Sequence, residues 1–507
     1  MKNKKNGFTL IELLAVIIVL AIIALIATPI IFNVIENAKI KSLENSCYGV
    51  IDAVRTKYAE ELLNLNKITN GNVNELTVSG EKPIDGTWTI DNSKDSEQRG
   101  IKIDNVRFSS MKDYACSNDL ETGKVSCKKT YKDNSSANTP ILFKNMVPIK
   151  YENNKWIIAD LGQKWYDYDA KEWANAVVLN SGVTKNVGDE VTEEEISLWY
   201  VWIPRYKYTI FNGNNGSAAA QLINVAFESG ISRTGTVTCT DNADGSETCS
   251  TITNGTSTYT HPAFKFGNTE LTGFWVGKFE VSGSTSIITV KPNVTSLRSQ
   301  TVSSLFTAIQ KVKTIYGINN ADSHMAKNME WGAVAYLKQS KYGLGTTDIA
   351  INDNSSFYTG GGTSDAYKTK VAQSTTGNIY GVYDMSGGAW EYVMGNMKNS
   401  SNAFYSSNAG FTTAPDAKYY DSYKYDTSYT SHARGKLGDA TKETLTTFGN
   451  TSGGWYSDDA NFPASSYSWF DRGGNYNNGT SAGVFYFGYS GGSSCSNDSA
   501  RAVLSAQ

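Results

Sequence analysis

The chain has 507 residues, of which 46 are lysine or arginine and 49 are aspartate or glutamate, so its formal net charge is -3. This balance excludes the overall basic footprint that is typical of nucleic-acid-binding proteins. The length predicts more than one domain, and an aromatic content of 12% with 30 tyrosines favours folded, strand-rich modules over disorder.

An apolar run from Phe8 to Phe32 follows a short leader that contains Lys2, Lys4 and Lys5. As a helix, this run is long enough to cross a bilayer of about 30 Å, and the lysines favour a cytoplasmic leader. Its one carboxylate, Glu12, is costly in lipid and therefore marks a functional position.

The stretch KNGFTLIELL, which includes Gly7, Phe8 and Glu12, resembles the cleavage motif of type IV prepilins and type II secretion pseudopilins. The resemblance implies that a prepilin peptidase cuts between Gly7 and Phe8 and that the new amino terminus is methylated. It also implies that the Glu12 carboxylate pairs with the amino group of Phe8 on a neighbouring pilin or pseudopilin subunit, neutralising a charge in the membrane. A plain membrane anchor with a glutamate near its end is the alternative.

The helix should continue beyond the membrane, because apolar residues recur every three or four positions: Leu43, Cys47, Val50, Val54, Tyr58 and Leu62. The polar stretch NKITNGNVN then ends this pattern, and strand-like runs follow it. We therefore expect a leader over residues 1–7, a transmembrane and stalk helix over 8–66, and a small pilin-like β head over 67–130. Residues 131–197 contain a linker and are otherwise unassigned.

Four of the six cysteines form two close pairs, Cys116 with Cys127 and Cys239 with Cys249, and each pair brackets a turn-rich insert. The second insert contains an Asp-Gly dipeptide, which is typical of hairpin turns. Two short disulfide-closed hairpins fit an oxidising, extracytoplasmic location. Nothing in the sequence pairs Cys47 or Cys495.

Four stretches of the C-terminal part, LTGFWVGKFEV, NMEWGAVAYL, TGNIYGVYDMSGGAWEYV and WFDRGGNY, resemble the formylglycine-generating-enzyme and sulfatase-modifying-factor family, a variant of the C-type lectin fold. The resemblance covers residues 198–507 and implies an irregular α+β domain, so the whole chain is expected to be α+β. The matching residues are expected to be scaffold: Trp331, Tyr383, Asp384, Trp390, Glu391, Trp469, Arg472, Gly473, Gly474 and Arg501.

An enzyme of the formylglycine-generating type is the disfavoured alternative. The copper-dependent members of that family use a cysteine pair shortly after the Arg-Gly-Gly motif, whereas the corresponding stretch NYNNGTSAGVFYF has no cysteine. The non-haem iron members would need histidine ligands, and no histidine follows His432. We therefore expect neither catalysis nor a metal site. Sugar-binding members of the wider lectin fold often use calcium, but no dense carboxylate cluster commits this chain to it, so no cofactor is expected.

The segment from Arg472 to Leu504 has the amino-acid composition of recognition loops. In such loops tyrosine supplies contact area, while serine, glycine and asparagine adapt their hydrogen bonds. It resembles the variable region of retroelement-diversified receptor proteins, and ordinary polar surface loops are the alternative. The residues expected to bind a ligand are Asn475, Tyr476, Asn477, Asn478, Thr480, Tyr486, Tyr489, Ser490, Ser493, Ser494 and Asn497.

Together these features predict a minor or tip pilin-like adhesin or receptor, held in the cytoplasmic membrane by one helix and displaying its C-terminal domain outside the cell. Its ligand would be a surface protein or a glycan. A secretion or competence pseudopilin is the alternative. DNA capture would use the basic, aromatic clusters around Arg205 and Lys207 or around Lys418 and Lys424. These clusters are more simply amphipathic strands with solvated lysines, so no nucleic-acid partner is expected.

Overall fold

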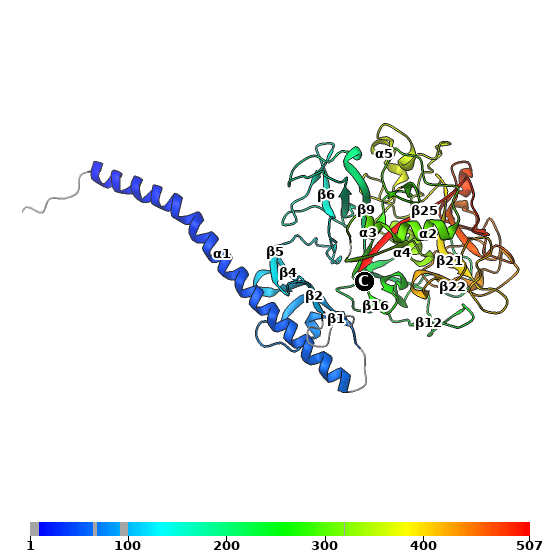
Figure 1. The fold of residues 1–507 in the computed structure, drawn as a ribbon, viewed down its shortest axis with the longest axis horizontal. Coiled ribbons are helices and arrows are strands. Elements are labelled where there is room, and N and C mark those ends of the chain that lie inside the picture. The colour runs from blue at the N-terminus through cyan, green and yellow to red at the C-terminus, as the bar shows by residue number, and fades with distance from the viewer. Residues whose placement is uncertain (1–9, 64–67, 92–99, 319, 507) are drawn as a thin grey trace, which may run out of the picture. The chain divides into compact units, whose positions relative to one another are not determined.

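The computed structural model describes residues 10–63, 68–91, 100–318 and 320–506. The chain divides into two compact units, Met1–Lys129 (unit 1) and Thr130–Gln507 (unit 2). Unit 1 combines one long helix with strands, and unit 2 combines many strands with short helices, so the α+β class expected from the sequence is confirmed (Figure 1).

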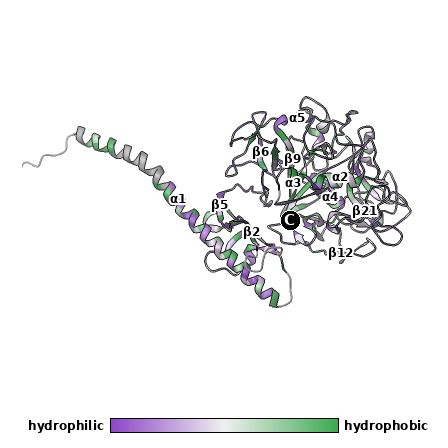
Figure 2. Cartoon of the chain, in the orientation of Figure 1, coloured by the Kyte–Doolittle hydropathy of each residue, from purple (hydrophilic) through white to green (hydrophobic). Residues whose placement is uncertain are grey.

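Unit 1 begins with one continuous helix, α1 (Leu10–Leu63), which covers a five-stranded antiparallel sheet. The apolar stripe expected on this helix is buried at Leu43, Cys47, Val50, Val54 and Tyr58. Leu62 is 40% exposed, because the helix ends one residue later and the sheet no longer covers it. In Figure 2, hydrophobic and hydrophilic residues alternate along the half of α1 that lies beside the sheet.

The sheet of unit 1 follows the order of the chain, so each strand pairs with the next one in sequence. Its strands are β1 (Asn70–Asn72), β2 (Pro83–Asp91), β3 (Gly100–Phe108), β4 (Tyr114–Asn118) and β5 (Val125–Lys129). Cys116 lies directly opposite Cys127 in the β4–β5 hairpin, and the two form the disulfide that was expected.

The predicted membrane and cleavage residues fall at the edge of the described region. Gly7 and Phe8 lie outside the described residues. Glu12 is part of α1, but only its backbone is described. Within the described part of the chain, no helix combines the length and the hydropathy of a membrane-spanning segment.

Unit 2 is built on a seven-stranded antiparallel sheet in the order β20-β26-β17-β9-β8-β6-β7. Residues 131–197, which the sequence left unassigned, supply three of these strands and so belong to this unit. The bounds are β6 (Val147–Glu152), β7 (Lys155–Ile158), β8 (Asn175–Leu179), β9 (Ile196–Pro204), β17 (Gly273–Gly277), β20 (Ala321–Met325) and β26 (Ala502–Ala506).

A second sheet of unit 2 carries the C-terminal segment in the order β22-β21-β23-β24, and β25 pairs with the first residues of β21 on the edge opposite β23. Its strands are β21 (Trp390–Met397), β22 (Asp421–Tyr423), β23 (Trp469–Gly473), β24 (Gly483–Ser490) and β25 (Asp498–Ala500). The β23–β24 pair is antiparallel, whereas β22 and β25 run parallel to β21.

Smaller strand pairs surround these sheets: β10 (Tyr206–Thr209) with β11 (Val225–Phe227) and β14 (Thr258–Thr260), β12 (Cys239–Asp241) with β13 (Glu247–Cys249), β15 (Lys265–Phe266) with β16 (Thr269–Glu270), and β18 (Ser282–Gly283) with β19 (Ile288–Thr289). The helices of unit 2 are α2 (Val302–Gln310), α3 (Val312–Ile315), α4 (Asn328–Lys338) and α5 (Ala366–Thr369).

The stretch HMAKNMEWGAVAYLKQS, residues 324–340, has apolar residues at the three- to four-residue spacing of a helix, but α4 takes up only Asn328–Lys338 of it. His324 and Met325 belong to β20, where Met325 pairs with Ala502, so the sheet rather than the helix takes the first residues of the pattern. Helix α2 was not expected from the sequence, although Thr301 caps its first turn by accepting a hydrogen bond from the Ser304 backbone at 3.2 Å.

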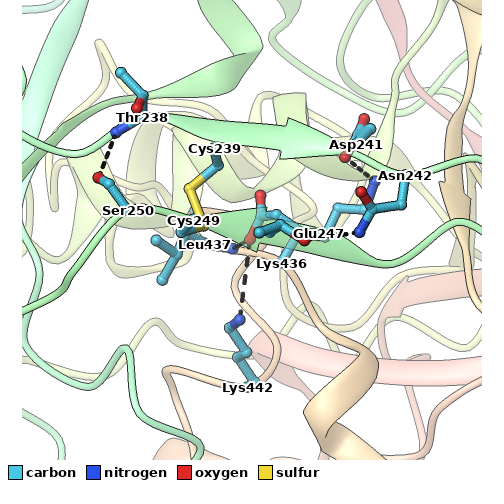
Figure 3. The surroundings of a disulfide bond; sticks show 12 residues. Thr238, Cys239, Asp241, Asn242, Glu247, Cys249, Ser250, Lys436, Leu437 and Lys442 are labelled. Atoms are coloured by element: carbon cyan, nitrogen blue, oxygen red, sulfur yellow. Dashed lines mark hydrogen bonds and ion pairs between the residues drawn. A yellow bond between two sulfur atoms is a disulfide. The ribbon is translucent and has the colours of Figure 1, made fainter.

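The β12–β13 hairpin is closed by the second expected disulfide, Cys239–Cys249, and is fastened to residues 436–442 (Figure 3). The ammonium of Lys436 lies 2.5 Å from the Asp241 carboxylate, and the Leu437 backbone donates a hydrogen bond to Glu247 at 3.2 Å. Burial raises the pKa of Glu247 to about 7, while Lys442, 4.0 Å away, acts in the opposite direction.

Candidate functional site

The Arg-Gly-Gly motif forms the base of the C-terminal segment. Arg472 on β23 is fully buried and donates hydrogen bonds to Asn328 at 3.2 Å and to the Ala440 carbonyl at 3.0 Å. Gly474 has a φ of +70°, and a Cβ placed there would lie 2.6 Å from the Cβ of Ala482. The motif thus ends β23 in a tight turn that a larger residue would strain.

A buried ionic cluster joins this sheet to the seven-stranded sheet. The guanidinium of Arg501 pairs with both carboxylate oxygens of Glu391 and donates to the carbonyls of Gly277 and Tyr383 at 2.8 and 2.9 Å. Asp384 accepts hydrogen bonds from Asn352 and the Gly360 backbone, both at 2.9 Å. The residues expected to be scaffold are buried, with Trp390 half-buried: Trp331, Tyr383, Asp384, Glu391, Trp469, Arg472, Gly473, Gly474 and Arg501.

Burial, opposed by Arg501, raises the pKa of Glu391 to about 7. Burial also raises the pKa of Asp384, and the pKa of Glu280 rises for the same reason together with the proximity of Asp384 and Glu391. Arg501 therefore acts against the effect of burial at two of these carboxyl groups, Glu391 and Asp384.

The loop after Gly474 is held by its own asparagines. Asn478 accepts a hydrogen bond from the Asn475 backbone at 2.7 Å, and Asn475 accepts one from the Asn477 backbone at 3.2 Å. Asn475 is buried, whereas Asn477 and Thr480 are exposed. Two of the predicted ligand-binding asparagines therefore shape the loop, and the loop presents Asn477 and Thr480 to solvent.

Tyr476 lies in a cluster that the sequence did not indicate. Its ring meets Phe357 edge to face at 4.8 Å, and the guanidinium of Arg298 lies 3.9 Å from the centre of the Phe357 ring. Arg298 also donates to the Ser496 carbonyl, so this cluster joins the loop after β23 to the segment before β25. We call Arg298, Phe357 and Tyr476 the Tyr476 cluster.

Tyr489 at the end of β24 lies in a second aromatic cluster. Its ring stacks on Tyr429 at 4.1 Å and meets Tyr467 at 5.3 Å. Tyr467 is 46% exposed, and Tyr429 and Tyr489 are half-buried. We call these three residues the tyrosine cluster.

The chain between β24 and β25 presents further polar groups. Ser490 shares a hydrogen bond with the Tyr392 hydroxyl at 2.9 Å, and the same hydroxyl donates to the Ser493 carbonyl at 2.8 Å. The side chains of Ser493 and Ser494 are exposed. The Asn497 carbonyl accepts from the Trp390 backbone at 2.9 Å, which returns the chain to the start of β21.

The predicted binding residues therefore lie at two places rather than in one site. Tyr476, Asn477 and Asn497 lie near the start of β21, whereas Tyr489 and Ser490 lie at the end of β24, where Ser490 meets β21 through the Tyr392 hydroxyl. Tyr486, between the two places, is buried. The structure thus brings together two smaller groups of exposed side chains.

Two buried carboxyl groups lie on the sheet between these places. Burial raises the pKa of Asp471 well above its usual range, and Asp498 adds to this effect. Burial raises the pKa of Asp498 itself to about 6, opposed by hydrogen bonds from Tyr392 and Cys495. Burial thus favours the protonated form of both carboxyl groups, and more strongly at Asp471 than at Asp498.

Among the described residues, two groups of cysteine and acidic side chains are close enough to hold a metal: Cys47 with Cys116 and Cys127, and Cys239 with Glu247 and Cys249. In each group two of the cysteines form a disulfide, which removes their thiolates as ligands.

The two basic clusters considered for DNA are engaged within unit 2. Arg205 is fully buried and pairs with Glu228 at 3.1 Å and Glu270 at 2.9 Å. Lys418 lies 3.5 Å from Asp322, and Lys424 lies 3.1 Å from Asp244. The Nζ of Lys207 donates to the Thr234 carbonyl at 3.2 Å.

Sequence reasoning missed Arg298, Phe357, Tyr429 and Tyr467, because each comes from outside the C-terminal segment. The stretch KYYDSYKYDTSYTSHAR, which contains Tyr429, is rich in tyrosine and serine, and this composition could have indicated a binding surface. Phe357 and Arg298 carried none.

Solved structures that are similar to this chain include the U1 and M1 variants of a Major Tropism Determinant. The U1 variant is 12% identical with a TM-score of 0.24 over 87% of this chain and 84% of that chain. The M1 variant is 13% identical with a TM-score of 0.26 over 85% and 82%. At these TM-scores neither similarity assigns a fold or a function.

The N-terminus gives a clear match. Residues 2–28, which include Gly7, Phe8 and Glu12, match the family described as "Prokaryotic N-terminal methylation motif". The "Prepilin peptidase-dependent protein A" of Clostridium perfringens (strain 13 / Type A) is 32% identical over 116 residues, which make up 21% of this chain and 83% of that relative. The chain therefore belongs to the family of prepilin peptidase-dependent proteins.

Proposed function

We propose that this protein is a minor or tip pilin-type adhesin or receptor. Prepilin peptidase would cut it between Gly7 and Phe8, and the apolar segment that follows the cut would anchor it in the membrane. Glu12 would pair with the methylated amino terminus during assembly with other subunits. The prepilin-type N-terminus and the relationship to a prepilin peptidase-dependent protein support this part of the proposal.

In this proposal unit 2 is the binding module, with the C-type lectin-like fold that its sequence motifs suggest, and its role is recognition rather than catalysis. The observation that carries it is the tyrosine cluster of Tyr429, Tyr467 and Tyr489, whose stacked rings reach the surface. Stacked tyrosines offer a stiff, amphipathic contact area at low entropic cost, and the exposed serines nearby can adapt their hydrogen bonds. A surface protein or a glycan would suit such a face.

The test is to probe arrays of surface proteins and glycans with the full chain in detergent, and with the variant Tyr429→Ala/Tyr467→Ala. We expect the variant to lose affinity about tenfold or more, because the loss of two central aromatic contacts typically costs this much. A matched control is Ile287→Ser, which changes an exposed apolar residue on the β18–β19 turn.

Full binding by the double tyrosine variant would contradict the assigned face, and absence of binding by the unaltered chain on both arrays would contradict the adhesin function. We expect no metal requirement, so a chelator should leave the binding unchanged.

A further inference from the structure

Three sulfur atoms of unit 1 come together between α1 and its sheet. The Sγ atoms of Cys47, Cys116 and Cys127 all lie within 4.8 Å of one another. Cys116 and Cys127 form the disulfide of the β4–β5 hairpin, and Cys47 carries a free thiol. All three residues are buried, so a free thiol rests against a disulfide in a closed environment.

The three cysteines lie together because of how α1 and the β4–β5 hairpin fold. Cys47 belongs to the buried stripe of α1, between Leu43 and Val50, so its side chain faces the sheet. The antiparallel register places Cys116 opposite Cys127 under this stripe. The Val125 backbone donates a hydrogen bond to the Tyr48 hydroxyl at 3.2 Å, which holds the next residue of α1 over β5.

We propose that this disulfide exchanges with Cys47, giving a second form in which Cys47 is bonded to Cys116 or Cys127 and α1 is fastened covalently to the sheet. In the exchange, the Cys47 thiolate attacks one sulfur of the disulfide and forms a new S–S bond. The old S–S bond breaks, and the other cysteine leaves as a thiolate that takes up the proton that Cys47 lost. The number of disulfides does not change, so no oxidant or reductant is consumed.

The loop lengths favour the second form. Cys116 and Cys127 are separated by 11 residues, whereas a bond to Cys47 closes a loop that includes most of unit 1. In the chain-entropy account, the longer loop restricts the unfolded chain more. The bond would also prevent α1 from being pulled away from its sheet.

Burial controls when the exchange occurs. Burial, with Glu44 nearby, raises the pKa of the Cys47 thiol to about 12, and the thiol form is not a nucleophile. The exchange is therefore slow while α1 lies on the sheet and occurs during folding or when the helix loosens.

Peptide mapping tests the proposal, because trypsin places the three cysteines in separate peptides, residues 42–55, 113–124 and 125–128. The full chain with Cys495→Ser is equilibrated in detergent with a glutathione redox buffer at mildly alkaline pH. It is then quenched with acid, alkylated and digested without reduction. We expect peptide 42–55 linked to one of the other two, with a matching loss of alkylated Cys47. Complete alkylation of Cys47 at equilibrium would overturn the proposal.

Variants in which one of the three cysteines is replaced give a second readout. With the oxidised glutathione of the same buffer as the oxidant, Cys47 and Cys116 should form a disulfide in Cys127→Ser and resist alkylation, and the same should hold for Cys47 and Cys127 in Cys116→Ser. The matched control Cys47→Ala/Cys127→Ser should leave Cys116 open to alkylation. If Cys116 is alkylated equally in Cys127→Ser and in this control, the proposal is wrong.

Discussion

Arg501 connects three parts of unit 2 through a single buried side chain. It pairs with Glu391 on β21 and donates to the carbonyls of Gly277 on β17 and Tyr383. Removal of its charge in Arg501→Met would leave Glu391 buried without its cation, close to Asp384. We expect the free energy of unfolding of unit 2 to fall by about 3–5 kcal/mol, as for other broken buried pairs. Urea titration followed by tryptophan fluorescence measures this loss.

The same substitution at an exposed arginine provides the control. Arg233 is 45% exposed and lies 3.1 Å from Glu270, so its ion pair is screened by water. Arg233→Met should cost about 1 kcal/mol or less. An equal loss for the two variants would show that the buried cluster does not depend on its arginine.

At the scale of elements, the β12–β13 hairpin combines one disulfide with several ion pairs at its edge. Lys436 pairs with Asp241 and Lys424 with Asp244, and in each pair one side chain, that of Asp241 or of Lys424, is largely exposed to water. Each such pair contributes about 1 kcal/mol or less, whereas a disulfide that closes a loop of this length contributes about 3 kcal/mol. The ion pairs alone are therefore too weak to keep the hairpin closed.

We expect Cys239→Ser/Cys249→Ser to open this hairpin while the two large sheets stay intact. Hydrogen–deuterium exchange measured by mass spectrometry should show amides of residues 239–249 exchanging about tenfold faster or more, a change of roughly 1.4 kcal/mol in opening free energy. Cys495→Ser, which removes a thiol outside the hairpin, is the control. Unchanged exchange in the double variant would mean that the ion pairs suffice.

Elements defined by local patterns could be predicted from the sequence. The stripe of α1, both disulfide hairpins and the tight turn after Arg472 follow from spacing within a few residues. The arrangement of the candidate site could not be predicted in this way. Strand β24 separates Tyr476 from Tyr489, and Phe357 and Tyr467 belong to other parts of the chain. Pairing of β20 with β26 likewise shortened α4, a long-range effect that no local pattern contains.

At the scale of the whole molecule, unit 2 buries carboxyl groups whose pKa values lie far above their ordinary range. Burial raises the pKa of Glu443 to about 7, against hydrogen bonds from the Gly438 backbone, Tyr208 and Tyr336. Burial likewise raises the pKa of Asp421 to about 6, with Lys327 opposing, and Glu391 behaves like Glu443. Each group is protonated in the folded state over a pH range in which it is ionised in the unfolded chain.

These shifts fix the sign of the pH dependence. A carboxyl group with a raised pKa stabilises the fold fully below its ordinary value, 4.5 for glutamate and 3.8 for aspartate, and loses this contribution as the pH rises through about 6 to about 7. Burial lowers the pKa of His261 to about 3, so this residue opposes the trend, but only below its ordinary value of about 6.5. We therefore expect unit 2 to be more stable at pH 5.5 than at pH 8.

Calorimetry at the two pH values tests this, and the unfolding midpoint should fall by about 5 °C or more between them. The variant Glu443→Gln tests whether ionisation of this carboxyl group causes the loss of stability. Glutamine has the shape of a protonated glutamate and keeps an oxygen that can accept from the hydroxyls of Tyr208 and Tyr336, each 2.8 Å away. This variant should match the unaltered protein at pH 5.5 and exceed it at pH 8, since it has no carboxylate to ionise in the core. A midpoint that rises with pH, or a variant that loses stability only at pH 8, would contradict the assignment of neutral carboxyl groups to the folded state.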